Sequence, residues 1–285
     1  MIIRRVILIL VVLFLALPGA VLAGEQDLQK AARVFSDVYG QGNVVEIMKN
    51  VKLLKDAGLS YQKSLVIPLE EVIDCKDQEG LRVLYGMYAF DENYAMVFGK
   101  RKEFLETLEV INSQVLDRLD VRDKLQITPI KPELLKDLLE DPENVEKRDV
   151  IFNSTQANID AMLKQAASDP EVMDVLIDAI YGTVIQGLYV ACELALNNES
   201  GDKMIALFNA QAQRVEKFNV LLDTFKDPEL SKMVEWEWVE RGPLIDGIQD
   251  LIKSKKGRLN RHDIEKILAA VKPVRNYFAR KCWLR

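Results

Sequence analysis

The amino-acid sequence predicts an all-α protein, built as an antiparallel multi-helix bundle or a layered helical array. Apolar residues recur at the helical period through almost every segment after residue 23. An Asp-Pro-Glu sequence begins at residues 141, 169 and 227, and each copy places an N-cap acceptor before a first-turn proline and an acid. The connections between these stretches are short, which favours antiparallel neighbours.

The individual helices follow from this periodicity and from start and stop signals. Leu28, Ala31 and Phe35 form the apolar stripe of the first helix, and Asn43 with Glu46 forms a capping box at the start of the second. Only 61–67 and 125–131 are expected to be extended. The predicted helices are 25–40, 43–57, 68–75, 78–98, 101–121, 132–140, 142–167, 170–197, 202–226, 228–240, 243–255 and 261–281.

Residues 1–23 have the pattern of a secretory signal peptide. Arg4 and Arg5 precede the apolar run Val6–Leu17, and Val21-Leu22-Ala23 offers small residues for cleavage. The run is shorter than the roughly 20 residues that a membrane-spanning helix needs. We therefore expect cleavage after Ala23 and a periplasmic or secreted protein, in which 24–285 form a single helical domain without an integral membrane segment. An uncleaved tether to the inner membrane is the alternative.

The overall charge argues against nucleic-acid binding. The formal net charge is −6 and becomes −8 once Arg4 and Arg5 are removed, whereas nucleic acids and anionic membranes both attract a basic footprint. The exception is a basic cluster near the C-terminus. Such a run is commonly a solvated face, and an acidic partner is the alternative. The cluster contains Lys253, Lys255, Lys256, Arg258 and Arg261.

The chain has three cysteines, Cys75, Cys192 and Cys282. Cys192 lies in an apolar helical stretch, where a free thiol behaves as a small buried hydrophobic group. Cys75 and Cys282 are then the better candidates for a disulfide. The cysteine spacings fit no zinc or redox site, and the single histidine, His262, cannot supply a di-iron or histidine-rich site. We predict no metal and no cofactor, with a b-type haem carrier as a remote alternative.

Two stretches of the sequence resemble one another. Leu84-Tyr85-Gly86 corresponds to Ile180-Tyr181-Gly182, and each stretch is followed by a long predicted helix. Two related helix-pair units could pack around a pseudo-twofold axis. Chance similarity between amphipathic helices is the alternative.

These same stretches carry a resemblance to a known group of proteins. Val83-Leu84-Tyr85-Gly86 with Tyr94-Ala95, and the run 186–191, resemble two stretches of an uncharacterised family of exported all-helical proteins of Gram-negative bacteria. The resemblance covers roughly 44–225. It implies an envelope location and a helical fold, and it implies no established activity. Many members of that family carry a lipoprotein signal, which this sequence lacks.

The tyrosines of the two stretches are the candidate ligand-binding residues. On a helix, residues at i, i+3 and i+7 share a face, and a cleft between tyrosines and carboxylates could bind a small cationic or hydroxylated ligand. The alternative is that the neighbouring glycines permit close helix approach while the tyrosines fill the core. The candidates are Tyr85, Tyr88, Glu92, Tyr181, Gln186, Tyr189 and Glu193.

The motifs of common enzymes are missing from the sequence. It contains no nucleophile elbow, phosphate-binding loop, His-Glu-x-x-His or calcium loop, and Ser60-Tyr61-Gln62-Lys63 lacks the companion elements of penicillin-recognising enzymes. The leading hypothesis is a non-catalytic envelope protein that binds another envelope protein or a small ligand. The alternative is a small-molecule enzyme or ligand-binding protein that uses the tyrosine and carboxylate cleft.

Overall fold

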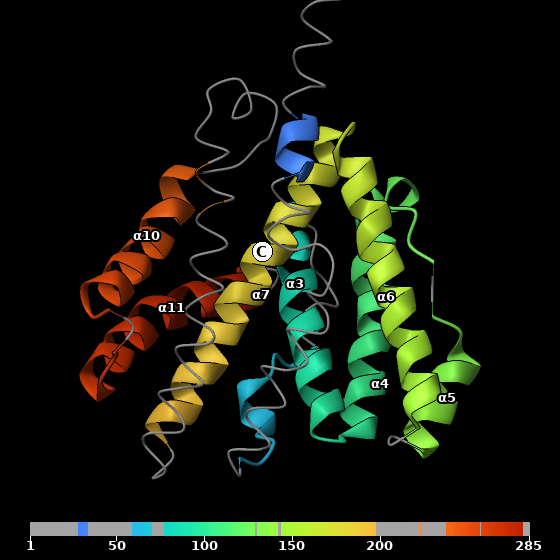
Figure 1. The fold of residues 1–285 in the computed structure, drawn as a ribbon, viewed down its shortest axis with the longest axis horizontal. Coiled ribbons are helices and arrows are strands. Elements are labelled where there is room, and N and C mark those ends of the chain that lie inside the picture. The colour runs from blue at the N-terminus through green and yellow to red at the C-terminus, as the bar shows by residue number, and fades with distance from the viewer. Residues whose placement is uncertain are drawn as a thin grey trace, which may run out of the picture.

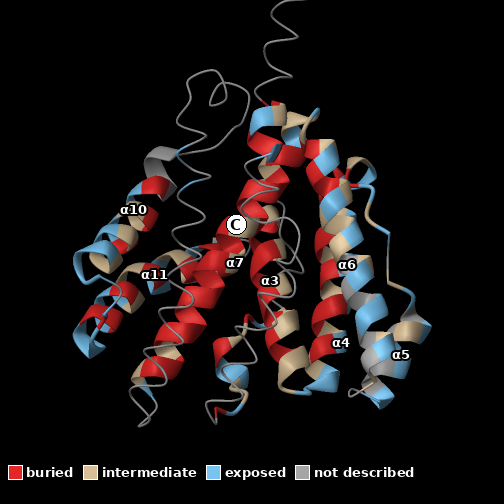
Figure 2. Cartoon of the chain, viewed as in Figure 1, coloured by how far each residue is buried: buried red, intermediate tan, exposed pale blue. Residues whose placement is uncertain are grey.

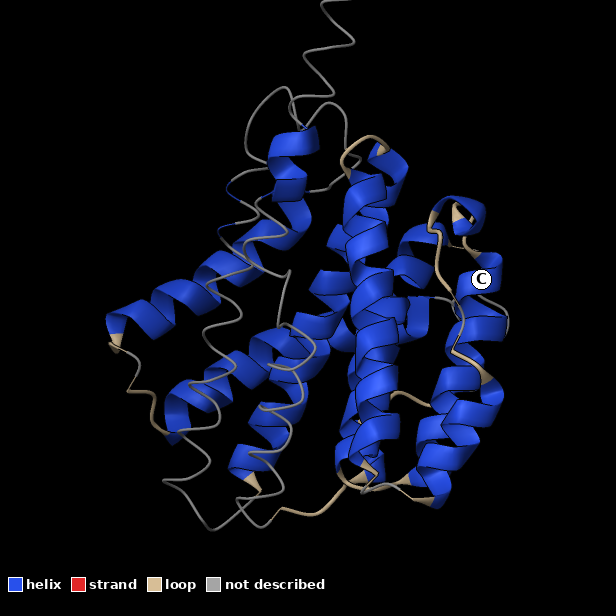
Figure 3. Ribbon diagram, turned by 45° about the vertical axis from the view of Figure 1, so that its right-hand side comes forward, coloured by secondary structure: helices blue, strands red, loops and turns tan. Residues whose placement is uncertain are grey.

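The computed structural model describes residues 28–33, 59–69, 77–128, 130–141, 144–197, 220, 223, 238–256 and 258–281. Every regular element among these residues is a helix (Figure 3). The predicted all-α class is therefore confirmed. The seven α-helices with described bounds are α3 (Gln78–Val97), α4 (Arg101–Val110), α5 (Pro132–Glu140), α6 (Val145–Ala166), α7 (Pro170–Leu196), α10 (Trp238–Ser254) and α11 (Arg261–Lys281).

Helices α3 and α7 form the centre of the described structure (Figure 1). Both are largely buried, as the red ribbon in Figure 2 shows. Their contacts advance along both helices in the same direction: Arg82 meets Asp178, and nine residues further along α3, Asp91 meets Gln186. The central pair is therefore parallel, although its two helices lie far apart in the sequence.

The remaining helices cover this pair on both sides. Helix α4 packs on α3, α6 packs on α7, and α5 packs on α6, while α11 packs on the other side of α7 and carries α10 (Figure 1). The helices joined by short turns, α3 with α4 and α6 with α7, run antiparallel as the short connections predict. The result is a layered helical array with a parallel pair at its centre.

Two glycines allow α3 and α7 to approach closely. A Cβ atom on Gly86 would collide with the carbonyl oxygen of Ala179, and one on Gly182 would collide with that of Val83. The contacts are reciprocal, because Val83 and Ala179 each precede a glycine by three residues. This reciprocity is what the predicted pseudo-twofold relation requires of the two Tyr-Gly stretches. The second long helix of the repeat, 202–226, lies outside the described residues apart from Val220 and Asp223.

Several helix starts and ends agree with the sequence signals. Asp169 accepts a hydrogen bond from the Glu171 amide at 3.0 Å, and Pro170 occupies the first turn of α7. Helices α5 and α11 have the predicted bounds. The predicted cap at Asp141 is wrong, because Asn144 accepts from the Lys147 amide and α6 begins at Val145.

Two predicted helices have different extents. The segment 101–121 is α-helical only to Val110 and continues as a π turn over Ile111–Val115 and a 3-10 turn over Leu116–Arg118. Side chains explain the change, since Asn112 and Ser113 donate to the carbonyls four residues earlier and loosen the helix. The predicted break before Pro243 is also wrong. Helix α10 continues through this proline, which removes one backbone hydrogen bond.

Other predictions lie outside the described residues. They are the signal peptide 1–23, the helices 43–57 and 202–226, the helix start at Asp227, and the disulfide between Cys75 and Cys282. Cys192 lies within the described structure. It is buried and free, as predicted, and burial raises the pKa of its thiol.

One described helix, α7, is long and apolar enough to span a membrane by length and composition. Its most apolar stretch is 89% buried inside the protein. Burial on all sides by α3, α6 and α11 accounts for this composition, because a helix at the centre of a helical array has no polar face.

The glycine crossing gives a direct test of the central packing. Gly86→Ala or Gly182→Ala should lower the free energy of unfolding by about 2 kcal/mol or more, because a carbonyl oxygen of the facing backbone occupies the position of the added methyl group. Urea denaturation measures the effect. The matched control is Gly247→Ala in α10, which has open space at its Cβ and should be neutral or stabilising by up to about 1 kcal/mol. Equal stability of the central and control variants would contradict this packing.

Candidate functional site

Three polar side chains meet in the interior where α3, α7 and α11 converge. Asp91, Gln186 and Arg275 are 2%, 0% and 9% exposed, respectively. Each comes from a different helix, and together they contact the backbone of the segment 59–69, which contains the 3-10 turn η1 (Lys63–Leu65). We refer to these three side chains, with the backbone of Leu65 and Ile67, as the Asp91 cluster.

Gln186 is the central member of the Asp91 cluster. Its Nε2 donates to Asp91 Oδ1 at 2.7 Å and to the Leu65 carbonyl at 3.0 Å, while its Oε1 accepts from Arg275 Nε at 3.2 Å. Arg275 also donates to the Leu65 carbonyl at 3.4 Å, and its guanidinium carbon lies 4.7 Å from the centre of the Tyr189 ring. Both amide protons and the amide oxygen of Gln186 are therefore used within the chain.

One face of α3 provides hydrogen-bonding partners for the irregular backbone of 59–69. Tyr94 Oη accepts from the Gln62 amide at 3.2 Å, Asp91 Oδ2 accepts from the Ile67 amide at 2.9 Å, and Tyr88 donates to the Pro68 carbonyl at 3.0 Å. These side chains are three residues apart and so lie along one side of the helix. A buried segment outside regular helix needs such partners for its backbone polar groups.

Burial also changes the ionisation of two acidic side chains on α3. Removal from water raises the pKa of Asp91 to about 7, and hydrogen bonds from Ile67 and Gln186 and the charge of Arg275 oppose this rise. Burial raises the pKa of the neighbouring Glu92 to about 7 as well. The half-buried Tyr85 has its pKa raised to about 12 by burial and by the nearby Glu92.

The structure divides the predicted site residues among several locations. Tyr88, Gln186 and Tyr189 contact the Asp91 cluster or the segment that it holds. The others lie elsewhere: Tyr85 and Glu92 are half-buried on α3, Tyr181 packs edge-on against Phe278 at 6.1 Å between ring centres, and Glu193 pairs with Lys272 at 2.9 Å.

Sequence reasoning missed two members of the Asp91 cluster. Asp91 follows the apolar run 87–90 and is next to a second acid, Glu92, and Arg275 lies in the amphipathic last helix. A carboxylate three residues from each of two tyrosines was the available signal for Asp91, since Tyr88, Asp91 and Tyr94 share one face. Arg275 gave no such local signal, because its partners lie 89 and 210 residues away in the chain.

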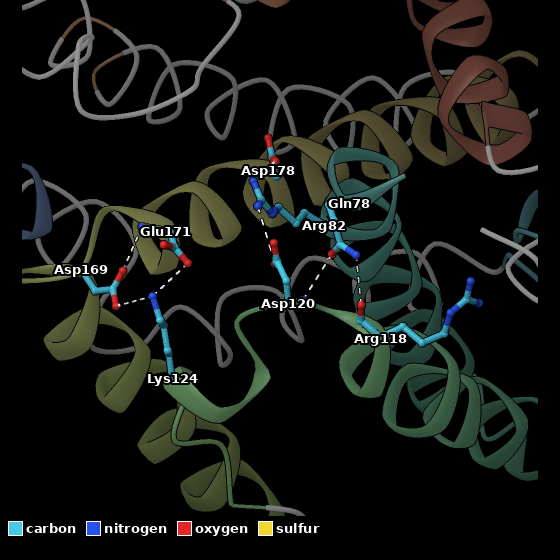
Figure 4. A network of polar contacts seen from close by, with 8 residues as sticks. All are labelled: Gln78, Arg82, Arg118, Asp120, Lys124, Asp169, Glu171 and Asp178. Atoms are coloured by element: carbon cyan, nitrogen blue, oxygen red, sulfur yellow. Dashed lines mark hydrogen bonds and ion pairs between the residues drawn. The ribbon is translucent and has the colours of Figure 1, made fainter. Parts of the chain in front are cut away.

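A second polar network fastens the loop that follows α4 (Figure 4). Gln78 donates to the Arg118 carbonyl at 3.2 Å and accepts from the Asp120 amide at 3.3 Å. Arg82 lies 3.8 Å from Asp120 and 4.0 Å from Asp178. These contacts tie the loop to the start of α3 and to α7.

The same loop is also tied to the first turn of α7 (Figure 4). Lys124, from the 3-10 turn η5 (Arg122–Lys124), lies 3.3 Å from Asp169 and 2.9 Å from Glu171. Because the side chains of Lys124 and Glu171 are 41% and 57% exposed, we expect this ion pair to contribute little to stability.

The Asp91 cluster binds the backbone of 59–69 and holds this segment against α3, α7 and α11. We call this arrangement the clamp. Within the part of the chain that the structure describes, no group of three or more His, Cys, Asp or Glu side chains is placed to hold a metal ion.

No protein-family model matches this chain, and no curated protein or solved structure is significantly similar to it. The resemblance to the family of exported helical proteins stays a prediction.

The Asp91 cluster predicts a large effect of removing its central amide. Gln186→Leu keeps a similar volume but leaves Asp91, Arg275 and the Leu65 carbonyl each without one partner, so the free energy of unfolding should fall by about 3 kcal/mol. The control is Lys272→Ala, which removes a half-exposed ion pair and should cost less than about 1 kcal/mol. Urea denaturation distinguishes the two variants, and a cost for Gln186→Leu no greater than that of the control would contradict the clamp.

The raised pKa values predict how stability depends on pH. The folded-state pKa of Asp91 lies above its ordinary value of 3.8, so this group favours the folded state most at low pH. Its contribution is lost as the pH rises from about 4 to about 7, and each unit of pKa difference corresponds to about 1.4 kcal/mol. Asp91→Asn should therefore reduce the fall in unfolding free energy across this range.

Glu92→Gln should act in the same direction, and the double variant should remove both contributions. Urea denaturation at several pH values between about 4 and about 8 measures the slopes. A wild-type slope retained in Asp91→Asn would show that the carboxyl does not titrate in this range.

Proposed function

We propose that this chain is an exported helical protein that acts by binding, to another protein of the cell envelope or to a small ligand, and not by catalysis. The observation that carries the proposal is the use of its buried polar groups. Gln186, Asp91 and Arg275 are satisfied by one another and by the chain's own backbone, as expected of groups that stabilise a fold. Catalytic groups are typically directed at a cleft.

The alternative of an enzyme with a cleft between α3 and α7 receives less support from the geometry. The two backbones touch at Gly86 and Gly182, which leaves no space for a ligand at the level of the Tyr-Gly sequences. Tyr88 and Tyr181 are fully buried. These features favour binding at the outer surface of the helical array.

Export is the first part of the proposal to test. In a Gram-negative host, the chain should appear in the periplasmic fraction with Gly24 as its N-terminal residue, because Ala23 ends the expected signal. Leu10→Arg interrupts the apolar run and should keep the protein in the cytosol, whereas Ala23→Leu should block cleavage alone. N-terminal sequencing of each fraction measures the outcome. Cytosolic retention of the wild type would contradict export.

The second part is the absence of catalysis. Purified protein should show no turnover of ester, phosphoester, peptide or glycoside substrates above that of Gln186→Leu, in which the Asp91 cluster is broken. A turnover activity that Tyr88→Phe or Glu92→Gln abolishes, while circular dichroism shows the variant still folded, would support the enzyme in place of the binding protein.

A further inference from the structure

The turn between α10 and α11 concentrates positive charge at one margin of the molecule. It projects at the left edge of Figure 1 and keeps a marginal position in the rotated view of Figure 3. Residues 253–266 contain six Lys or Arg and two acids, a net charge of +4 in a chain whose total is −6. Figure 2 shows this turn mostly in the colour of exposed residues. We refer to 253–266 as the basic turn.

The two acids of the basic turn are already engaged. Asp263 is buried, accepts from the Asn260 amide at 3.1 Å and lies 3.3 Å from Lys255. Glu265 lies 3.4 Å from Arg261 and 3.6 Å from His262. Within the described residues, four exposed cations of the turn have no ion-pair partner: Lys253, Lys256, Arg258 and Lys266.

The backbone holds these cations in a defined arrangement. Lys256 has a φ of 51°, a left-handed conformation that usually selects glycine. Its amide donates to the Lys253 carbonyl at 3.0 Å, and the Arg258 amide donates to the Lys255 carbonyl at 2.9 Å. Asn260 and Asp263 then cap α11 reciprocally. Lys256 therefore has a strained backbone conformation.

We propose that the basic turn docks on the anionic phospholipid headgroups of a membrane. The turn lies at the margin of the molecule and its cations are on long, exposed side chains, which suits contact with a flat array of negative charges. The expected export signal, with its apolar run Val6–Leu17, would bring the chain to a membrane. The acidic remainder of the protein opposes docking only weakly, because salt screens charges beyond about 8 Å.

This inference goes beyond the proposed function, and its test is independent of the export and turnover tests. The full chain is incubated with sedimentable vesicles of equal parts phosphatidylglycerol and phosphatidylcholine, and with vesicles of phosphatidylcholine alone. The fraction bound should be at least tenfold higher on the anionic vesicles and should fall as salt is raised. Lys253→Glu/Lys256→Glu/Arg258→Glu should weaken binding at least tenfold.

The control has the same change in net charge at a distant surface. Lys102→Glu/Lys131→Glu/Lys136→Glu replaces three exposed lysines of α4 and the α5 region and should bind as the wild type does. Circular dichroism should show both triple variants folded, because all six side chains are exposed. Equal binding of the two triple variants, or no preference for anionic vesicles, would overturn the proposal. Binding to soluble polyglutamate but not to anionic vesicles would also overturn it, in favour of an acidic protein partner.

Discussion

The close approach of α3 and α7 is the constraint on which the rest of the structure depends. Glycine at positions 86 and 182 lets each backbone meet the carbonyl of a residue in the other helix. At that separation the short amide of Gln186 can reach Asp91, and Thr183 can donate to the Gly86 carbonyl at 3.0 Å. A larger residue at either glycine would separate the helices and the polar groups that they pair.

The polar interior follows from a second requirement, the burial of an irregular segment. Leu59, Leu65 and Ile67 bury apolar side chains between the helices, which stabilises the fold through the hydrophobic effect. Their backbone amides and carbonyls are taken out of water at the same time, and each unpaired group would be destabilising. Tyr88, Asp91 and Tyr94 supply partners along one face of α3. The polar groups on this tyrosine-rich face of α3, which in the sequence looks like a ligand-binding site, therefore bind the backbone of the segment 59–69.

Local signals in the sequence predicted the helices well where the local chain decides the structure. The Asp169-Pro170 start, the bounds of α5 and α11 and the burial of Cys192 depend on neighbouring residues or on simple amphipathicity. The same Asp-Pro pattern failed at Asp141, where a second cap, Asn144, lies three residues further on. A local sequence pattern does not show which of two suitable N-cap residues begins the helix.

The candidate site was predicted less completely, because its members depend on tertiary contacts. Tyr88, Gln186 and Tyr189 stood out by composition, and the structure brings all three to one region. Their partner Arg275 could not be found, because a charged residue in an amphipathic helix is ordinarily solvated. Its burial arises only once α11 lies against α7.

The clamp on 59–69 has a consequence for the order of assembly. Leu65 receives hydrogen bonds from residues 121 and 210 positions later, so its environment is complete only when nearly the whole chain has been made. Contacts of such long sequence separation slow folding, because the chain loses the entropy of closing a long loop before the contact can stabilise it. The interior of a nascent chain is therefore incomplete until α11, the last helix, has been synthesised and packs against α7.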